Sequence, residues 1–341
     1  MRRNTFYPQV ALLQLAARDH AWLIDPLTIT DLDSLRGFFR RPDCLKVLHS
    51  CSEDLEVFRH WLGVSPEPLV ATQRAAALLG EAHGISYRGL VEQLPGDVLD
   101  KGETRSNWLQ RPLSESQCHY AAQDVLYLVP VWQEMRHQAD SRGRLPWVLE
   151  EGQQALRQID EREHEAFRRV KGAGRLTPRQ LAILRSLYQW REQRARHVDK
   201  PRGWVLEDRV CVAIALALPQ HLEALAAIEG MPASVVRRQG DTILRLVADA
   251  QELSATALPE GAPTPLTSSQ RSLLKALKTQ LRQLCDDAGI APELAMTASD
   301  LEKLIRQERD SSDGNSPERW QGWRHKVIVE PLRGFLEKSQ A

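Results

Sequence analysis

Tyr120 and Asp124 are the first residues in this sequence whose types and spacing could do chemistry. They stand four positions apart, so a helix would place both on one face. Ser114 and Gln117 have the spacing of a capping box, which predicts that such a helix begins just after Ser114. A phenol one turn before a carboxylate can position a water molecule beside a metal ion that the carboxylate holds. The same spacing is common in ordinary amphipathic helices, so this pattern alone leaves both interpretations open.

Asp54 is a second acid with possible chemistry, because it falls in the first turn of a helix that Ser52 is expected to cap. The short apolar segment before that helix, residues 45–48, is predicted to be a buried strand. An acid in a first turn is favoured by the helix dipole, which is a purely structural explanation. A strand-to-helix junction also places carboxylates at a sheet edge, where metals and phosphates bind. The sequence does not decide between the two.

The scaffold that must position these acids is expected to be an α/β domain with a mixed sheet, because strand and helix patterns alternate along residues 1–150. Two mostly apolar runs on either side of a turn-like segment predict a β-hairpin from residues 10–15 and 21–24. Helical spacing of apolar residues predicts helices at residues 31–40, from Ser52 onward, at 69–79 and at 86–94.

A polar loop at residues 99–108 precedes the capping box. Lys101 and Arg105 bracket it, Trp108 ends it, and Arg111 follows shortly after. Basic residues next to an aromatic side chain could line a groove for a nucleic-acid strand. A solvated loop with Trp108 anchored in the core is the equally plain alternative.

Six ordered blocks between about residues 3 and 150 together resemble bacterial ribonuclease D. They are residues 7–9, 23–26, 48–58, 99–101, 108–113 and 120–124. Ribonuclease D is a 3′–5′ exonuclease of the DEDD superfamily, with a ribonuclease H-like sheet and two divalent metal ions, commonly Mg²⁺ or Mn²⁺. The resemblance implies that Asp54 and Asp124 are metal-binding catalytic acids and that Tyr120 orients the attacking water.

Two departures from the family pattern bear on that expectation. The family's first motif, an Asp-x-Glu on the first strand, lies just upstream of the segment that starts here at Met1. The sheet is therefore expected to lack its first strand and two of the family's four metal-binding carboxylates, which predicts an inactive and poorly stable N-terminal domain. The second departure is Ala71, where the family usually has Asp.

The remainder of the chain is predicted to be helical. We expect an exonuclease domain at 1–150, a linker helix at 151–174, an HRDC domain at 175–252, a Pro/Thr/Ser-rich linker at 253–269 and a second HRDC-like domain at 270–341. The HRDC resemblance is strongest at residues 201–206, and HRDC domains bind nucleic acid. Thr177 and Pro178 have the pattern of a helix start.

Residues 171–213 carry ten Lys/Arg against four Asp/Glu, an excess that suits phosphate contact. Lys171, Arg175, Lys200 and Arg202 are the candidates for it. A solvated helix surface would show the same composition.

Composition limits the remaining possibilities. The 341 residues include 45 Lys/Arg and 45 Asp/Glu, so nucleic-acid binding must come from local patches. The five scattered cysteines form no zinc pattern and favour a reducing compartment. No apolar run could span a membrane, and the N-terminus lacks a signal-peptide pattern. We expect a cytoplasmic protein, with no membrane or protein partner implied.

Two functions from different classes remain. The first is an exoribonuclease of ribonuclease D type that trims the 3′ ends of tRNA precursors by two-metal hydrolysis. The second is a non-catalytic RNA-binding protein that keeps the groove and the HRDC domains.

Overall fold

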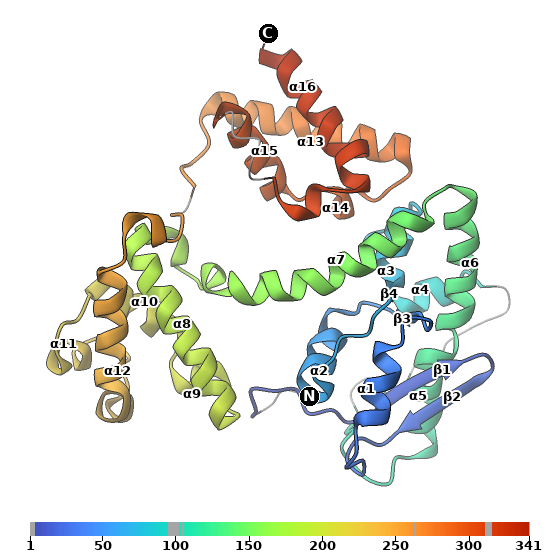
Figure 1. The fold of residues 1–341 in the computed structure, drawn as a ribbon, viewed down its shortest axis with the longest axis horizontal. Coiled ribbons are helices and arrows are strands. Elements are labelled where there is room, and N and C mark those ends of the chain that lie inside the picture. Colours follow the sequence, from blue (N-terminus) through green and yellow to red (C-terminus); the bar gives the residue numbers. More distant parts are fainter. Residues whose placement is uncertain (1–3, 95–101, 104–105, 262, 311–315, 341) are drawn as a thin grey trace. The chain divides into compact units, whose positions relative to one another are not determined.

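The computed structural model describes residues 4–94, 102–103, 106–261, 263–310 and 316–340 (Figure 1). The chain divides into two compact units. One joins Met1–Gln9 to Asp160–Pro265, and the other joins Val10–Ile159 to Leu266–Ala341. In the part of the chain that is described, no helix combines the length and the apolar character that a membrane span requires.

The strands of the second unit occur in pairs. Strands β1 (Leu13–Ala17) and β2 (His20–Ile24) form the expected antiparallel hairpin, with Leu15 opposite Trp22. Strands β3 (Lys46–Leu48) and β4 (Leu69–Ala71) pair in parallel. Across the described residues these are two separate two-stranded sheets. The mixed pairing expected from the sequence is therefore present, but it is split between two sheets.

The predicted helix at residues 69–79 is wrong at its start. Leu69, Val70 and Ala71 are strand β4, and the alanine-rich helix α3 begins only at Thr72 (Thr72–Leu78). All three strand residues are buried, so their side chains lack the polar positions that would have revealed a strand period. Strand β4 also packs closely against Gly152. A Cβ atom at position 152 would collide with the carbonyl oxygen of Leu69.

Helix α2 (Ser52–Leu62) also differs from expectation at its first turn. Its N-cap residue is Cys51, which makes no side-chain capping bond, and Ser52 lies inside the helix. The helix buries Leu55, Phe58 and Leu62, as its apolar spacing predicts. The other helices between residues 10 and 164 are α1 (Asp33–Arg40), α4 (Tyr87–Val91), α5 (Glu115–Leu126), α6 (Leu128–Ser141) and α7 (Leu145–His164). The last of them, α7, continues past Ile159, where this part of the unit ends.

The C-terminal helices share a hydrophobic core with residues 70–148. They are α13 (Ser268–Ala288), α14 (Pro292–Ala295), α15 (Ala298–Asp310) and α16 (Glu330–Gln340), with a 3₁₀ turn at Glu318–Trp320 and a π-helical turn at His325–Val329. Leu78 and Met135 belong to the same buried cluster as Leu294 and Trp323. The amide of Ala291 donates to the carbonyl of Ala77 at 2.8 Å. A separate domain at 270–341 stays a prediction, and these contacts tie that segment to the exonuclease residues.

The other unit is a helical bundle. It contains α8 (Pro178–Val198), α9 (Arg202–Val205), α10 (Asp208–Ala217), α11 (Leu222–Ala226) and α12 (Ala233–Gln251), with 3₁₀ turns at Ala166–Arg169, Ala173–Arg175 and Ala255–Ala257. Helices α10 and α12 pack on α8 (Figure 1). Thr177 and Gln180 form a full capping box with Pro178 in the first turn, which confirms the predicted start. The single-turn helix α9 lies within residues 201–206, where the HRDC resemblance is strongest.

Candidate active site

Helix α5 positions Tyr120 and Asp124. Its capping box is complete: the Ser114 hydroxyl accepts from the Gln117 amide at 3.1 Å, and the Gln117 side chain accepts from the Ser114 amide at 3.0 Å. Ala121 is fully buried, so the helix packs closely through that residue. Contacts with both strands of the β-hairpin hold the helix in place.

Tyr120 and Asp124 lie close enough that the charge of Asp124 affects the pKa of Tyr120. Burial raises the pKa of the Asp124 carboxyl to about 6. Burial also raises the pKa of the Tyr120 phenol, the charge of Asp124 raises it further, and the charge of Arg88 opposes that rise. Asp124 is thus a partly desolvated carboxylate beside a protonated phenol, with a guanidinium nearby. Such a carboxylate gains from a bound cation or proton.

Tyr87 adjoins this pair and His49 adjoins Tyr87, and the sequence analysis named neither as a site residue. The Tyr87 hydroxyl donates to the carbonyl oxygen of Gln123 at 3.0 Å. Burial raises the Tyr87 pKa, and the charge of Asp124 contributes to the rise. The His49 ring centroid is 5.8 Å from that of Tyr87, and its Nδ1 lies 2.9 Å from Oγ1 of Thr72. These contacts connect the end of β3 and the start of α3 to α5.

Asp54 lies in the first turn of α2, as predicted. A short connection of three residues joins the end of β3 to the start of this helix. The residue is exposed, yet protein atoms crowd its carboxyl enough that desolvation, followed by the charge of Glu53, raises its pKa to about 6. The charge of Glu53 thus contributes to the raised pKa of Asp54, whereas burial alone accounts for the raised pKa of Asp124. The structure brings Tyr120 and Asp124 together and places Asp54 on a different helix.

The loop before α5 approaches Tyr120. A Cβ on Gly102 would lie 3.5 Å from the Tyr120 ring, and the half-buried Trp108 ring has its centroid 6.1 Å from that of Tyr120. The Glu103 carboxylate accepts from the Ser116 hydroxyl at 2.8 Å, which ties the loop to the first turn of α5. Lys101 and Arg105 lie outside the described residues.

Arg111 uses all its hydrogen-bond donors within the protein. Its Nε and one terminal nitrogen donate to the Asp25 carboxylate at 2.6 and 2.7 Å. The other donors bind the carbonyls of Ala11, Trp108 and Gln110 at 2.7 to 2.9 Å. Since a guanidinium has five N–H groups and these bonds number five, none is left for RNA in this arrangement. An RNA contact by Arg111 stays a prediction, and the occupied donors favour a role in anchoring the loop to the hairpin.

The predicted phosphate-binding residues of the helical bundle differ in their surroundings. Lys171, Arg175 and Lys200 are exposed. Arg202 is half-buried: it forms an ion pair with Glu192, and its guanidinium carbon lies 4.6 Å from the Phe6 ring centroid. Arg202 therefore also fixes α9.

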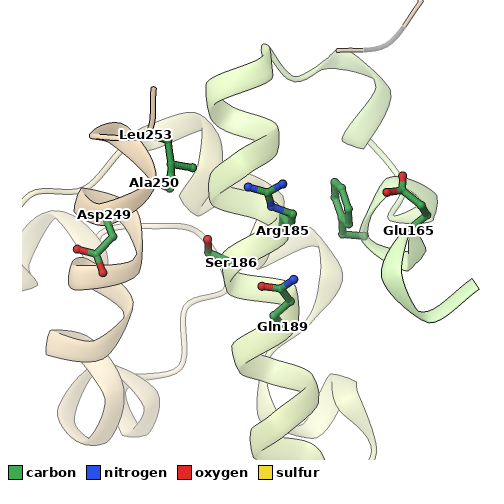
Figure 2. Close-up of a pocket in the computed structure, with 8 residues that line it drawn as sticks. Glu165, Arg185, Ser186, Gln189, Asp249, Ala250 and Leu253 are labelled. Atoms are coloured by element: carbon green, nitrogen blue, oxygen red, sulfur yellow. The ribbon is translucent and has the colours of Figure 1, made fainter. Parts of the chain in front are cut away.

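A hollow of about 410 Å³ opens in the bundle between α8 and α12 (Figure 2). Arg185, Ser186 and Gln189 reach it from α8, and Asp249 reaches it from α12. Glu165 and Asp249 give it two acids against one arginine, so phosphate is a poor ligand for it. None of the predicted site residues lines this hollow.

A divalent cation fits the donor chemistry of Asp54 and Asp124. Both are desolvated carboxylates with raised pKa values, and hard cations prefer carboxylate oxygens. Among the described residues, however, no group of three or more His, Cys, Asp or Glu side chains is arranged to hold a metal. Asp54 on α2 and Asp124 on α5 each offer one carboxylate, whereas such a cation commonly needs more ligands.

Comparison with known proteins matches both units. Residues 1–140 match the family model of 3′–5′ exonucleases, and residues 180–247 match the HRDC domain. Ribonuclease D of Pseudomonas paraeruginosa is 40% identical over 99% of this chain and 90% of its own length. Ribonuclease D of Escherichia coli is 36% identical over 99% of this chain and 91% of its own length.

Comparison with solved structures leads to the same family. The crystal structure of Escherichia coli RNase D, described as an exoribonuclease involved in structured RNA processing, superposes with a TM-score of 0.83 at 35% identity, covering 99% of this chain and 91% of that one. A protein from Bifidobacterium adolescentis, at a TM-score of 0.61 and 21% identity over 98% of this chain and 89% of its own, shares the fold.

Fold and site together define a 3′–5′ exonuclease joined to an HRDC domain, with a ribonuclease H-like catalytic part. The chain belongs to the ribonuclease D family, whose members are 3′–5′ exoribonucleases. It therefore acts on RNA and carries a nucleic-acid-binding domain, in a family of exonucleases that generally depend on divalent metals.

Proposed function

We propose that this chain trims the 3′ ends of tRNA precursors in the cytoplasm by hydrolysis that depends on two Mg²⁺ or Mn²⁺ ions. The observation that carries the proposal is the Tyr120–Asp124 pair, a desolvated carboxylate next to a protonated phenol. Support for the substrate class comes from the ribonuclease D relatives, one of which acts in structured RNA processing.

In this proposal each residue has a separate role. Asp124 binds a cation through its carboxylate, and Tyr120 donates its phenolic proton to orient the attacking water. Asp54 supports the second cation from α2. The bound cations would lower the pKa of water and stabilise the charge on the leaving oxygen. Lys171, Arg175, Lys200 and Arg202 contact the RNA phosphates.

The proposed domain boundaries follow from the same assignment. We assign the exonuclease to 1–150, a linker helix to 151–174, the HRDC domain to 175–252, a linker to 253–269 and a second HRDC-like domain to 270–341. The HRDC match at residues 180–247 and the helix that Thr177 caps support the boundary between residues 174 and 175.

A non-catalytic RNA-binding protein is the second candidate. The observation that favours it is the small number of acids: the described residues contain no cluster of three possible metal ligands. This candidate keeps the exposed Lys171 and Arg175 and drops the hydrolytic roles of Tyr120 and Asp124.

The discriminating experiment measures removal of 3′ nucleotides from a tRNA precursor with Mn²⁺ or Mg²⁺. These 341 residues are compared with the same chain preceded by the first-motif strand of a ribonuclease D relative. In the form that trims RNA, Asp124→Asn should abolish trimming while RNA binding in EDTA stays within about twofold, because the change removes a metal ligand and leaves the charged groove. Trimming by Asp124→Asn at the parent rate would refute the site, and no trimming by either parent form would favour the binding protein.

A further inference from the structure

Trp204 is the most exposed large hydrophobic side chain in the described residues. Its side chain is 65% exposed, against 49% for Trp22 on strand β2. A single exposed hydrophobic residue is common on protein surfaces and needs no explanation by itself. The surroundings of Trp204 make the difference, because they hold its backbone firmly and place a cation beside its ring.

Helix α9 presents Trp204 on a fixed support. Its backbone is closed by bonds from the Trp204 amide to the Pro201 carbonyl at 2.9 Å and from the Leu206 amide to the Arg202 carbonyl at 3.1 Å. Leu206 anchors the turn in the core at 1% exposure. Arg202 fixes the other side through its ion pair with Glu192 and its contact with the Phe6 ring. The exposed indole thus projects from a helical turn whose backbone is hydrogen-bonded and whose residues Arg202 and Leu206 contact the rest of the unit.

The charges around α9 favour an anionic ligand. The ammonium of Lys200 lies 5.8 Å from the centroid of the Trp204 ring, within the range of a cation–π contact. Lys200 itself is exposed, as is Arg196 one turn earlier. Lys200 lies between α8 and α9 and adjoins the indole, whereas the guanidinium carbon of Arg196 lies 5.5 Å from the centroid of the Phe6 ring.

The acids of the same segment are occupied within the protein. The Asp199 carboxylate accepts from the amides of Phe6 and Tyr7 at 3.0 and 3.2 Å. The other three acids of residues 171–213 all form ion pairs: Glu192 with Arg202, Glu207 with Arg209, and Asp208 with Arg191. The four acids of this segment are therefore engaged with backbone amides and arginines of the protein.

We propose that Trp204 stacks on an unpaired base of single-stranded RNA while Lys200 contacts the adjoining phosphate. The combination of a rigidly held aromatic ring and a neighbouring cation is how proteins bind single strands without reading their sequence. A base in a duplex already stacks on its neighbours, so this surface selects an unpaired stretch such as the overhanging 3′ end. The inference rests on the proposed RNA substrate and adds which part of it this unit holds.

A protein partner is the competing occupant of an exposed tryptophan. Charge favours RNA, because the ammonium of Lys200 beside Trp204 matches a phosphate backbone and would have to be desolvated at an apolar protein interface. Self-association through Trp204 would make the oligomeric state depend on this side chain, so it can be separated from RNA binding by experiment.

The experiment measures binding of the full chain to a labelled single-stranded RNA of about 12 nucleotides, a length within the site size of such proteins. EDTA prevents hydrolysis, and a blunt RNA duplex of the same length is the second ligand. The variants are Trp204→Ala, Trp204→Phe, Lys200→Gln and, as a matched control, Trp22→Ala, which removes the other exposed tryptophan. Thermal unfolding checks each variant, and sedimentation reports its oligomeric state.

Trp204→Ala should weaken single-strand binding by about 5- to 150-fold, since stacking one base on an aromatic side chain is worth about 1–3 kcal/mol. Trp204→Phe should recover most of that loss, and duplex binding should change by less than twofold. The salt dependence should keep its slope in Trp204→Ala and lose about 0.7 in Lys200→Gln. Trp22→Ala should bind like the parent.

Four results would overturn the proposal: parent-like single-strand binding by Trp204→Ala, an equal loss for duplex and single strand, a change of oligomeric state, or no single-strand binding by the parent. Because binding is measured without metal, a chain that binds in this way but never trims RNA would sink the proposed catalysis and leave the stacking site standing.

Discussion

The hydroxyl of Tyr87 on α4 donates to the carbonyl oxygen of Gln123 on α5 at 3.0 Å, directly before the predicted metal-binding Asp124. The bond is half-buried, and the His49 ring lies 5.8 Å from that of Tyr87 on the way to the end of β3. Helix α5 is thus fixed at its C-terminal half from α4, while its capping box fixes its start. We infer that this bond holds Asp124 at its position beside Tyr120.

Tyr87→Phe tests that inference with the smallest possible change. Loss of one half-buried hydrogen bond should lower the free energy of unfolding by about 0.5–1.5 kcal/mol. In the form of the chain that trims RNA, kcat should fall about tenfold with KM for RNA nearly unchanged, because misplacing a reacting group by 1 Å can cost about 100-fold. Tyr188→Phe on α8 removes a hydroxyl from the other unit and should leave kcat unchanged. A lower stability with unaltered kcat would limit Tyr87 to a structural role.

Tyr120→Phe should separate water orientation from metal binding. The ring and its contact with Trp108 are retained, and only the phenolic hydroxyl group is lost. We expect the hydrolysis rate to fall about 10- to 100-fold, toward the lower end of what a positioned proton donor contributes. The Mn²⁺ concentration for half-maximal rate should change by less than about threefold. A large shift in that concentration would mean that Tyr120 acts on the metal ligands themselves.

The raised pKa of Asp124 predicts an unusual pH dependence of stability for the metal-free chain. The folded carboxyl titrates near pH 6 and the unfolded one near its ordinary value of 3.8, so the folded state binds the extra proton between them. Stability should therefore rise as the pH falls from 7 toward 4.5, by at most about 3 kcal/mol from this group. Thermal unfolding in EDTA across that range measures it.

Asp124→Asn is the variant that assigns the effect to one residue. It should raise the melting temperature at pH 7 and flatten the profile between pH 4.5 and 7, apart from the contribution of Asp54. Adding Mn²⁺ should stabilise the parent more than the variant. A profile that is unaltered by the substitution would show that Asp124 is not the desolvated group.

The sequence predicted the helix that carries Tyr120 and Asp124 better than it predicted the residues around that helix. Ser114, Gln117 and Thr177 are local signals, and all three form the predicted caps because a capping box depends only on residues within one turn. The ordered family motifs likewise located Asp54 and the Tyr120–Asp124 pair on the expected helices. These signals lie within a few residues of what they determine.

The failures concern features that distant residues decide. Residues 69–71 form a strand because they pair with Lys46–Leu48 and are buried, and an apolar run carries no sign of that pairing. Tyr87 has no motif of its own, since its partner Gln123 is 36 positions away. The donors of Arg111 are occupied partly by Ala11 and Asp25 at the hairpin, about a hundred positions before it, so the polar loop gave no sign of this anchoring role, and the RNA contact stays a prediction.

Glu151 predicts how strongly the C-terminal helices depend on the exonuclease residues. Its carboxylate on α7 is 1% exposed and pairs with Arg324, which is itself buried, and with Arg74 at 2.9 Å. It also accepts from the indole nitrogen of Trp323 at 2.9 Å. Burial would raise the pKa of Glu151, but the charges of Arg324 and Arg74 lower it overall. The stabilisation is therefore present above pH 4.5 and lost as the pH falls through the lower folded value.

Glu151→Ala should destabilise the chain by about 3–5 kcal/mol at pH 7, because it leaves the Arg324 guanidinium buried without its anionic partner. Against a typical domain stability of about 5–15 kcal/mol, residues 10–159 and 266–341 should lose much of their resistance to thermal unfolding together. Glu150→Ala is the matched control: its half-buried carboxylate accepts only a long 3.4 Å bond from the Trp323 amide, and its loss should cost less than about 1 kcal/mol. The double variant Glu151→Leu with Arg324→Leu removes the buried ion pair and should recover part of the stability, since an apolar pair can replace it, while Arg74 and the Trp323 indole lose their acceptor. If Glu151→Ala melts like Glu150→Ala, the ion pairs do not hold the C-terminal helices in place, and their apolar contacts through Leu294 and Trp323 suffice.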